Sequence, residues 1–266
     1  MNNFPTGKPH ISFSEIKQWK ECPWRHKLLY IDKIDLFEPS PHLDYGTSVH
    51  NACESYLKTG KMMTESAEKE IRTAFEKNGE TWYEQGHPHV DTWVDWAKIS
   101  LDALPGYFDE TFGEWEAVEA EEYLYEEIDG KKIKFKGFID AIIKTKDKKG
   151  KEIYWILDYK TAPKYGWRKE KKQSILMTAQ LILYKHFWSR KHSVALKDIR
   201  CGFILMKRGS KPDRSCELVT VSVGPKTLAR GIKMMNNMIS SVKNSMFLKN
   251  RDSCKWCQYK NTNHCT

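Results

Sequence analysis

The sequence has no apolar run long enough to cross a membrane. Its most apolar stretch, residues 175–184, includes Thr178 and Gln180, whereas a membrane-spanning helix needs about 20 apolar residues. The opening segment MNNFPTGKPH has no basic patch followed by an apolar run, so we expect no secretory signal. Internal repeats and low-complexity tracts are also missing. These absences, with an ordinary share of charged residues, predict a soluble globular protein without a membrane segment.

Cysteine is scarce, and acidic residues are outnumbered by basic ones. Seven cysteines in 266 residues are not needed as disulfides, because a chain of this length can bury a sizeable core. In the cytoplasm, where we expect the protein, cysteines are more often buried or bound to metal than paired. The 44 Lys and Arg residues exceed the 35 Asp and Glu residues by nine, which favours a polyanionic partner. The 10 Trp, 12 Tyr and 11 Phe residues argue against disorder.

The first half of the chain reads as helical. Ser12 and Glu15 form a capping box that opens a helix, and Pro23 ends that helix near Cys22. A proline-rich stretch at 38–41 follows, and a helical region then covers 48–115. Within this region the apolar spacing predicts helices from about Thr47, at 64–85 and at 90–112.

The second half reads as a sheet core at 116–223 followed by a C-terminal part at 224–266. Alternating patterns predict strands at 116–128, 132–145, 152–160, 199–207 and 216–223, with a helix at 174–189. A final helix begins near Pro225 and runs to about Phe247. We treat residues 1–266 as one α/β domain.

Two aspartates and a lysine interrupt the apolar hairpin of 132–145 and 152–160. A three-residue loop, Lys148–Lys149–Gly150, would place Asp140 opposite Asp158, with Lys160 on the same face. Opposed carboxylates, with Cβ atoms about 5 Å apart, repel one another unless a proton or cation lies between them. Mg²⁺ or Mn²⁺ suits such oxygen ligands, and Lys160 can activate a water or stabilise a phosphate.

The alternative for this hairpin is a salt-bridged patch on an exposed sheet face. Lys160 would then only neutralise one of the aspartates. The two interpretations depend on the register, because a slip by one residue puts Asp140 and Asp158 on opposite faces.

Cysteines cluster in the tail. Cys254, Cys257 and Cys265 lie close together in sequence, and Cys22 can supply a fourth thiolate from the other end of the chain. This spacing suits either zinc or an iron–sulfur cluster, and His264 is a competing ligand. The other three cysteines, Cys53, Cys201 and Cys216, are expected to be small buried hydrophobic residues.

A basic and aromatic loop precedes the helix at 174–189. It contains Lys164, Tyr165, Trp167, Arg168, Lys169, Lys171 and Lys172. Such a loop can grip phosphates and stack bases, although a solvated linker is the common alternative.

Short motifs along the chain resemble the PD-(D/E)XK nuclease superfamily, and more closely its RecB-like branch, which includes the nuclease of CRISPR adaptation and many phage exonucleases. The motifs are G-F-I-D at 137–140 and D-Y-K at 158–160. They are joined by G-T-S-V-H at 46–50, Q-L-I-L-Y at 180–184, and the opening S-F-S at 12–14 with C-P-W-R at 22–25. They occur in the order of that branch and span residues 11–265.

The resemblance implies a fold and a site. The fold is a restriction-endonuclease-like core, a central mixed sheet flanked by helices, with a helical insertion and a cysteine-ligated metal-cluster tail. The implied metal ligands are His50, Asp140, Asp158 and the carbonyl of Tyr159, with Lys160 catalytic alongside the two aspartates.

Several neighbouring residues have weaker assignments in the same resemblance. One of Glu119, Glu121 and Glu122 can join the metal through a water, and Glu54 can orient His50 from one helical turn away. Gln180 and Tyr184 share a helical face that would border the site and touch the nucleic acid, together with Lys164 and Arg168; packing into the core is the alternative for this helix.

The resulting expectation is a metal-dependent DNA exonuclease acting on single strands or DNA ends. The branch includes members with a 4Fe–4S cluster held by one cysteine before the nuclease motifs and three after them, as Cys22, Cys254, Cys257 and Cys265 would be. A helicase or recombination protein as partner, a homo-oligomer, and a bacterial or phage-infected cell fit this function. The alternatives are a non-catalytic nucleic-acid-binding subunit and a zinc-stabilised interaction protein.

Overall fold

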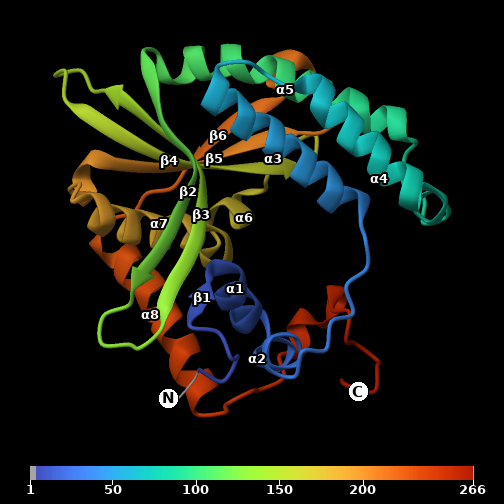
Figure 1. The fold of residues 1–266 in the computed structure, drawn as a ribbon, viewed down its shortest axis with the longest axis vertical. Helices are drawn as coiled ribbons and strands as arrows, with labels where there is room; N and C mark the ends of the chain where they lie inside the picture. The colour runs from blue at the N-terminus through green and yellow to red at the C-terminus, as the bar shows by residue number, and fades with distance from the viewer. Residues whose placement is uncertain (1–3, 266) are drawn as a thin grey trace.

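A six-stranded mixed sheet forms the centre of the protein in a computed structural model that describes residues 4–265. Met1–Asn3 of the opening segment, and Thr266, lie outside the described residues. The strands are β1 (His10–Ser12), β2 (Trp115–Glu127), β3 (Lys134–Lys146), β4 (Glu152–Ala162), β5 (Ile199–Lys207) and β6 (Cys216–Thr220). Their order is β1-β3-β4-β5-β6, with β2 also paired to β3 (Figure 1). The β1–β3 and β4–β5 pairs are parallel and the others antiparallel, so the predicted mixed sheet is confirmed.

Helices cover both faces of this sheet (Figure 1). One layer is built from α3 (Pro41–Thr59), α4 (Thr64–Glu84) and α5 (Val90–Phe112), and the other from α1 (Phe13–Glu21), α7 (Ile175–His192) and α8 (Pro225–Lys243). Successive side chains of β4 point to opposite faces of the sheet, so the strand contributes to the hydrophobic core on each face. Ile156 packs with the α7–α8 layer and Leu157 with the α3–α5 layer. Shorter helical segments are α2 (Pro23–His26), α6 (Lys169–Gln173), a π-helical turn (Lys27–Ile31) and 3₁₀ turns at Leu196–Asp198, Pro212–Arg214 and Arg251–Trp256.

Most element boundaries agree with the sequence patterns. The Ser12 side chain accepts a hydrogen bond from the Glu15 amide at the start of α1, as the capping box predicted. The helix expected from Thr47 is wrong in its start: α3 begins at Pro41, because a proline fits the first helical turn, where no amide donor is needed. The last helix ends at Lys243 and not near Phe247.

The sheet also contains a strand that the sequence patterns missed. β1 is only three residues long and pairs with β3 from His10↔Lys134 to Ser12↔Lys136. A segment this short carries no alternation signal, and its place in the sheet depends on a partner more than 100 residues away. The sheet is therefore not confined to the expected 116–223 core.

Within residues 4–265, no helix is long and apolar enough to span a bilayer.

Candidate active site

The sheet splits at the G-F-I-D motif of β3. β2 occupies one edge of β3 along almost its whole length. The other edge is shared, since β1 pairs with Lys134–Lys136 and β4 pairs with Ala141–Lys146. Residues 137–140 lie in the gap between these two partners.

The hairpin register is the predicted one up to this gap. Ala141 faces Leu157 and Lys146 faces Glu152, and Gly150 adopts the left-handed φ of 77° that the loop requires. The expected direct pairing of Asp140 with Asp158 is wrong, because the ladder ends one pair earlier. Asp140 Oδ2 instead accepts a hydrogen bond from the Tyr159 amide at 2.8 Å, while β4 continues along β5 from Asp158 to Ala162.

A cavity of about 390 Å³ opens at the split. Both aspartates and Lys160 line it, so the acidic pair and the lysine share one surface even without direct pairing. The other lining residues come from the N-terminal segment, β3 and α7: Lys8, His10, Ser12, Phe13, Ser14, Lys136, Gly137, Phe138, Gln180 and Tyr184.

Asp158 is a buried carboxylate. Its side chain is 0% exposed, and its polar contact with the described residues is the Lys160 ammonium, which forms a close ion pair with Oδ2. Burial raises the pKa of the nearby Asp140, and the charge of Asp158 raises it further. The structure thus holds two carboxyl groups where one lysine compensates only part of their charge.

Lys160 stays protonated in this surrounding. Burial works to lower its pKa, but the charges of Asp158 and Asp140 outweigh burial, and the pKa is raised. The side chain is therefore an ammonium, which donates hydrogen bonds and carries positive charge at the cavity.

His50 reaches Asp140 from α3, on the other side of the sheet. Its Nδ1 lies 3.3 Å from Asp140 Oδ2. Burial and the charge of Lys160 lower the pKa of His50, so the imidazole is neutral at pH 7 and keeps a lone pair for a metal. Glu54 forms an ion pair with Lys58, and no hydrogen bond between Glu54 and His50 is found among the described residues.

Tyr159 contributes its backbone to the site and its side chain to the core. The ring is 1% exposed and lies among the α3–α5 residues, 6.1 Å from the His50 ring. Its amide holds Asp140, and its backbone also hydrogen-bonds His50.

Of the three candidate glutamates, Glu119, Glu121 and Glu122 of β2, Glu121 is the one that lies near the site. It stands opposite Asp140 in the β2–β3 register, between the pairs Ala120↔Ala141 and Glu122↔Ile139. Its φ is +57°, a rare value for a non-glycine residue inside a strand. Burial raises the pKa of Glu121, and the charges of Glu54 and Asp158 add to the rise.

The left-handed residue changes which way the β2–β3 ribbon faces. Ala120 and Ala141 pack in the α3–α5 core, whereas Leu124 and Ile139 pack in the α7–α8 core. Strict alternation would put Ala120 and Leu124 of β2 on the same face of the ribbon. It would also put Ile139 and Ala141 of β3 on the same face. The ribbon therefore turns at Glu121 and Asp140, where the candidate site lies.

The other two glutamates point elsewhere. Glu122 bonds Lys191 and His192 of α7, at 2.6 Å and 2.9 Å, and the Glu119 carboxylate accepts from the Ala120 amide.

Gln180 and Tyr184 line the cavity and contact each other. Gln180 Nε2 donates to the Tyr184 hydroxyl at 3.3 Å. The Tyr184 ring packs against Gly137, where an added Cβ would lie 2.7 Å from Tyr184 Cε1. This close approach explains the glycine of the G-F-I-D motif, and it links that motif to the helix motif.

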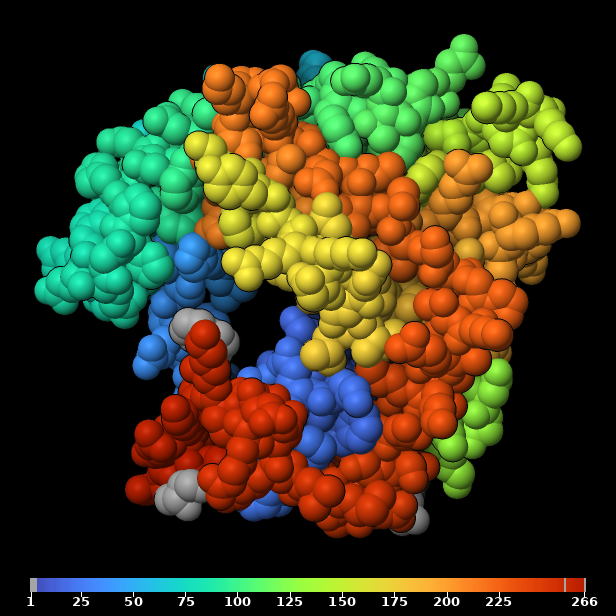
Figure 2. Space-filling model, turned by 180° about the vertical axis from the view of Figure 1, so that it is seen from behind, coloured from blue at the N-terminus to red at the C-terminus, as the bar shows by residue number. Residues whose placement is uncertain are grey.

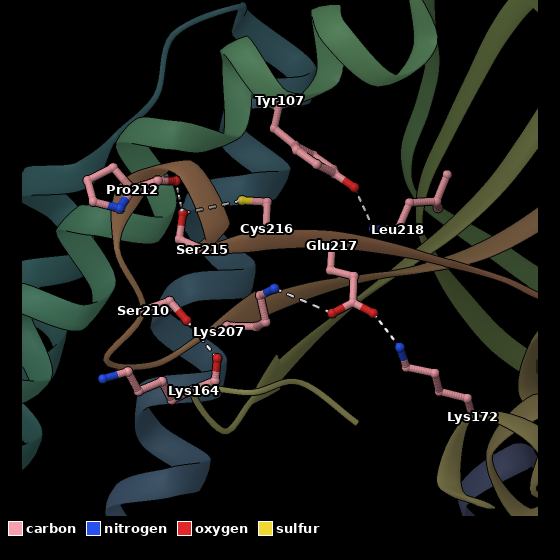
Figure 3. Close-up of polar contacts among 10 residues, drawn as sticks. All are labelled: Tyr107, Lys164, Lys172, Lys207, Ser210, Pro212, Ser215, Cys216, Glu217 and Leu218. Carbon is pink, nitrogen blue, oxygen red and sulfur yellow. Dashed lines mark hydrogen bonds and ion pairs between the residues drawn. The ribbon is translucent and has the colours of Figure 1, made fainter. Parts of the chain in front are cut away.

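The basic loop is anchored to the sheet by polar contacts (Figure 3). Lys172 and Lys207 both form ion pairs with Glu217 of β6, and the Lys164 carbonyl accepts from the Ser210 hydroxyl at 2.8 Å. Trp167 is buried, with the Lys171 ammonium 4.6 Å from its ring centroid. The Lys164 and Arg168 side chains are exposed and do not line the cavity.

The four cysteines singled out in the sequence meet around a second cavity. Cys22, Cys254, Cys257 and Cys265 all line this space of about 300 Å³. The tail is held there by hydrogen bonds from Ser253 and Asn250 side chains to the Glu21 carbonyl. All seven cysteines are free thiols.

The other candidates for this cluster are placed as well. His264 does not line the cavity; its carbonyl accepts from Trp24 Nε1. Cys53, Cys201 and Cys216 are buried in helix and sheet, as predicted.

Among the described residues, neither cavity shows a complete set of metal ligands. Over the described part of the chain, no three His, Cys, Asp or Glu residues are grouped as a metal site would need. The donors still fit the chemistry: the carboxylate oxygens of Asp140 and Asp158 line one cavity, and hard divalent cations prefer oxygen ligands.

Comparison with known proteins decides the family. The sequence profile of the PD-(D/E)XK nuclease superfamily matches residues 10–262, almost the whole chain. The chain belongs to the PD-(D/E)XK nuclease superfamily. The match includes the split hairpin, the His50 helix and the Gln180 helix in one continuous region. No curated protein matches the sequence.

A solved structure supports the fold of this superfamily member. The crystal structure of a candidate exonuclease from Eubacterium rectale aligns with a TM-score of 0.57 at 14% identity, covering 98% of this chain and 92% of that one. At that identity the likeness concerns the fold alone. The structure of SSO0001 aligns with a TM-score of 0.34 at 16% identity, over 92% and 93% of the two chains.

Proposed function

We propose that this protein is a metal-dependent deoxyribonuclease of the RecB-like branch that hydrolyses phosphodiester bonds at the split in the sheet. The observation that carries the proposal is the fully buried Asp158, which lies with Asp140 and Lys160 on an open cavity, so that one ammonium faces two carboxyl groups. Burying two carboxyl groups together costs stability, and such costs are typically retained at functional sites. Membership in a nuclease superfamily supplies the reaction class.

The residues that would hold Mg²⁺ or Mn²⁺ are His50, Asp140, Asp158 and the carbonyl of Tyr159. A bound divalent cation supplies Lewis-acid activation of water and neutralises charge on the phosphate. Neutral His50 offers a ring nitrogen, and the Tyr159 amide holds the Asp140 carboxylate in place.

Lys160 acts as a cation. The charges of Asp158 and Asp140 raise its pKa and keep the ammonium protonated in the metal-free protein. It can stabilise the negative charge that develops on the scissile phosphate. Asp158, its ion-pair partner, keeps Lys160 at the cavity.

The substrate in this proposal is a single strand or a DNA end, cut as an exonuclease does. Figure 2 shows an opening in the molecular surface between the loop after β4 (yellow), the N-terminal residues (blue) and the C-terminal tail (red). The cavity residues Ser12 and Phe13 come from the N-terminal segment, and Lys160 lies near the end of β4, just before the loop. An opening enclosed by protein favours a flexible strand over a rigid duplex. Gln180, Tyr184 and the exposed Lys164 and Arg168 would contact this strand.

The cysteine cavity is proposed to hold a 4Fe–4S cluster, with zinc as the alternative. Cys22, Cys254, Cys257 and Cys265 surround one space, and cysteine thiolates bind either metal. The cluster would be structural, because it joins α2 to a tail more than 200 residues away. A role in recombination, repair or replication in the cytoplasm of a bacterial or phage-infected cell, beside a helicase or as a homo-oligomer, follows from the branch.

The test is cleavage of end-labelled single- and double-stranded DNA by the anaerobically purified protein with Mg²⁺, Mn²⁺ or EDTA. Lys160→Ala should abolish cleavage and leave DNA binding intact, with some loss of stability because the buried Asp158 loses its ion-pair partner, whereas Lys98→Ala, on the surface of α5, should cleave normally. Equal cleavage by Lys160→Ala and the wild type would overturn the assignment. Binding without cleavage under every metal would instead support a non-catalytic nucleic-acid-binding subunit.

A further inference from the structure

Exposed aromatic side chains continue outward from the active-site cavity along the β2–β3 ribbon. Beyond the turn at Glu121 and Asp140, the inner face of this ribbon packs on α7 and α8, which lie behind it in Figure 1. The outer face carries Phe138, Tyr123 and Tyr125, which we call the aromatic strip. Phe138 is 43% exposed and Tyr123 45% exposed, a large solvent contact for rings in a sheet.

The three rings form a continuous row. Phe138 and Tyr123 are cross-strand partners with ring centroids 5.1 Å apart. Tyr123 and Tyr125 stack at 5.9 Å with an interplanar angle of 9°. His10 of β1 closes the row with an edge contact to Tyr125 at 5.8 Å.

Lysines accompany the rings. The Lys136 ammonium lies 5.6 Å from the Phe138 centroid, and the Lys134 ammonium lies 5.0 Å from that of Tyr125. Lys8 and Lys136 also line the active-site cavity. Glu127, opposite Lys134 in the register, is the acidic residue at the far end of this row.

The aromatic strip begins inside the active-site cavity. Phe138 lines that cavity and is two residues from Asp140 along the same strand. The inner side of the ribbon is held firmly by Glu122, which bonds Lys191 and His192. A chain leaving the scissile position along the ribbon therefore meets Phe138 first, then Tyr123 and Tyr125.

We propose that the aromatic strip is a base-stacking platform for single-stranded DNA, which binds the nucleotides next to the scissile phosphate. Flat rings accept any unpaired base, and the interleaved lysines match the phosphates between them. A duplex cannot use the platform, since its bases are already stacked on one another. The inference rests on the proposed nuclease function and adds a substrate class to it: unpaired, base-bearing strands.

A protein-docking face is the competing explanation for exposed aromatic residues. The cores of protein–protein interfaces are depleted of lysine, whereas here lysine ammonium groups lie over two of the three rings of the aromatic strip. Charge and continuity with the cavity both favour a nucleic acid.

The test compares binding of an oligothymidylate with an abasic oligonucleotide of equal length and charge, by fluorescence anisotropy in EDTA so that no cleavage occurs. The wild type should prefer the base-bearing strand. Tyr123→Leu and Phe138→Leu should each reduce that preference about tenfold, the scale of one base–ring stack, and leave abasic binding unchanged. Tyr123→Phe and Phe138→Tyr keep the ring and should keep the preference. Tyr83→Leu removes a similarly exposed ring on α4 and should have no effect.

Equal affinity of the wild type for the two strands, or an unchanged preference in the leucine variants, would overturn the platform. Cleavage by wild type but not by Lys160→Ala in the same preparation separates this failure from failure of the nuclease assignment. If a leucine variant does not fold, photocrosslinking the wild type to an iodouracil-containing strand replaces it. Crosslinks at Tyr123, Tyr125 or Phe138 support the platform, and crosslinks confined to other residues refute it.

Discussion

Replacing Asp140 with asparagine should abolish cleavage and at the same time stabilise the metal-free protein. Asp140 and Asp158 lie together at the split in the sheet, and only Lys160 compensates their charge there. Asparagine keeps an oxygen that can accept from the Tyr159 amide and removes one negative charge. The gain in stability and the loss of activity come from the same change, because the carboxylate serves the metal and not the fold.

The size of the effect follows from the charges. Two carboxylates that share one site repel by a few kcal/mol at an effective dielectric of 20. The Lys160 ammonium offsets part of this, which leaves a net gain of about 1–2 kcal/mol for Asp140→Asn. For a protein of this size, that corresponds to a melting temperature higher by about 2–8 °C.

The stabilisation should depend on pH. Burial and Asp158 raise the pKa of Asp140 in the folded state. The contribution of Asp140 to the free energy of unfolding of the wild type is therefore complete only below the unfolded pKa of about 3.9. This contribution is lost as pH rises through the folded pKa. The advantage of Asp140→Asn should be greatest at pH 8 and should vanish in acid.

The assay is thermal unfolding followed by tryptophan fluorescence in EDTA from pH 4 to pH 8, repeated with Mn²⁺. Bound metal should stabilise the wild type, by about 2.7 kcal/mol at 100 times the dissociation constant, and should have little effect on Asp140→Asn. Asp213→Asn changes an exposed carboxylate and should be neutral in every condition. If Asp140→Asn is less stable than the wild type in EDTA at all pH values, Asp140 is a structural partner of His50 and Tyr159 and the reasoning fails.

Three further substitutions test other parts of the site. Gly137→Ala should destabilise the protein by about 1–3 kcal/mol and impair cleavage, since its Cβ would lie 2.7 Å from Tyr184 Cε1; denaturant unfolding measures this, and an unchanged midpoint would contradict the close contact. Cys257→Ser should lower metal content and melting temperature if the cysteine cavity is ligated, whereas Cys201→Ser should leave the metal content unchanged; equal iron, sulfide and zinc in Cys257→Ser and wild type would refute ligation. The double variant Lys164→Ser with Arg168→Ser should weaken DNA binding and reduce the slope of log affinity against log salt concentration by the equivalent of about two phosphate contacts. Lys172→Ser should change this slope less, because the Lys172 charge is already paired with Glu217. An identical salt slope in the double variant and the wild type would exclude a phosphate role for this loop.

Local sequence was sufficient for much of the fold. The capping box at Ser12, the helices at 64–85 and 90–112 and the hairpin register near Gly150 all depend on residues close together in the chain. Caps, helical periodicity and a short loop with a left-handed glycine are local physical effects, so the sequence alone expresses them. The residues of the candidate site were identified for the same reason: they are clustered in short motifs.

Contacts between distant segments decided the rest. β1 pairs with β3 up to Lys136, and β4 pairs with β3 only from Ala141, so Asp140 and Asp158 are not partners in the ladder. No local pattern in residues 10–12 predicts this arrangement. The choice of Glu121 over Glu119 and Glu122 depends on a left-handed residue inside β2 and on partners from α7.

The sequence by itself determined the superfamily to which the chain belongs and identified the side chains proposed for the site. Only the tertiary structure decided where the sheet splits, that four cysteines from both ends surround one cavity, and which aromatic rings stay exposed beside the site. The physical reason is that residue type and local conformation are set by neighbours in the chain. Burial, register at a strand end and convergence of distant residues are set by packing across the whole domain.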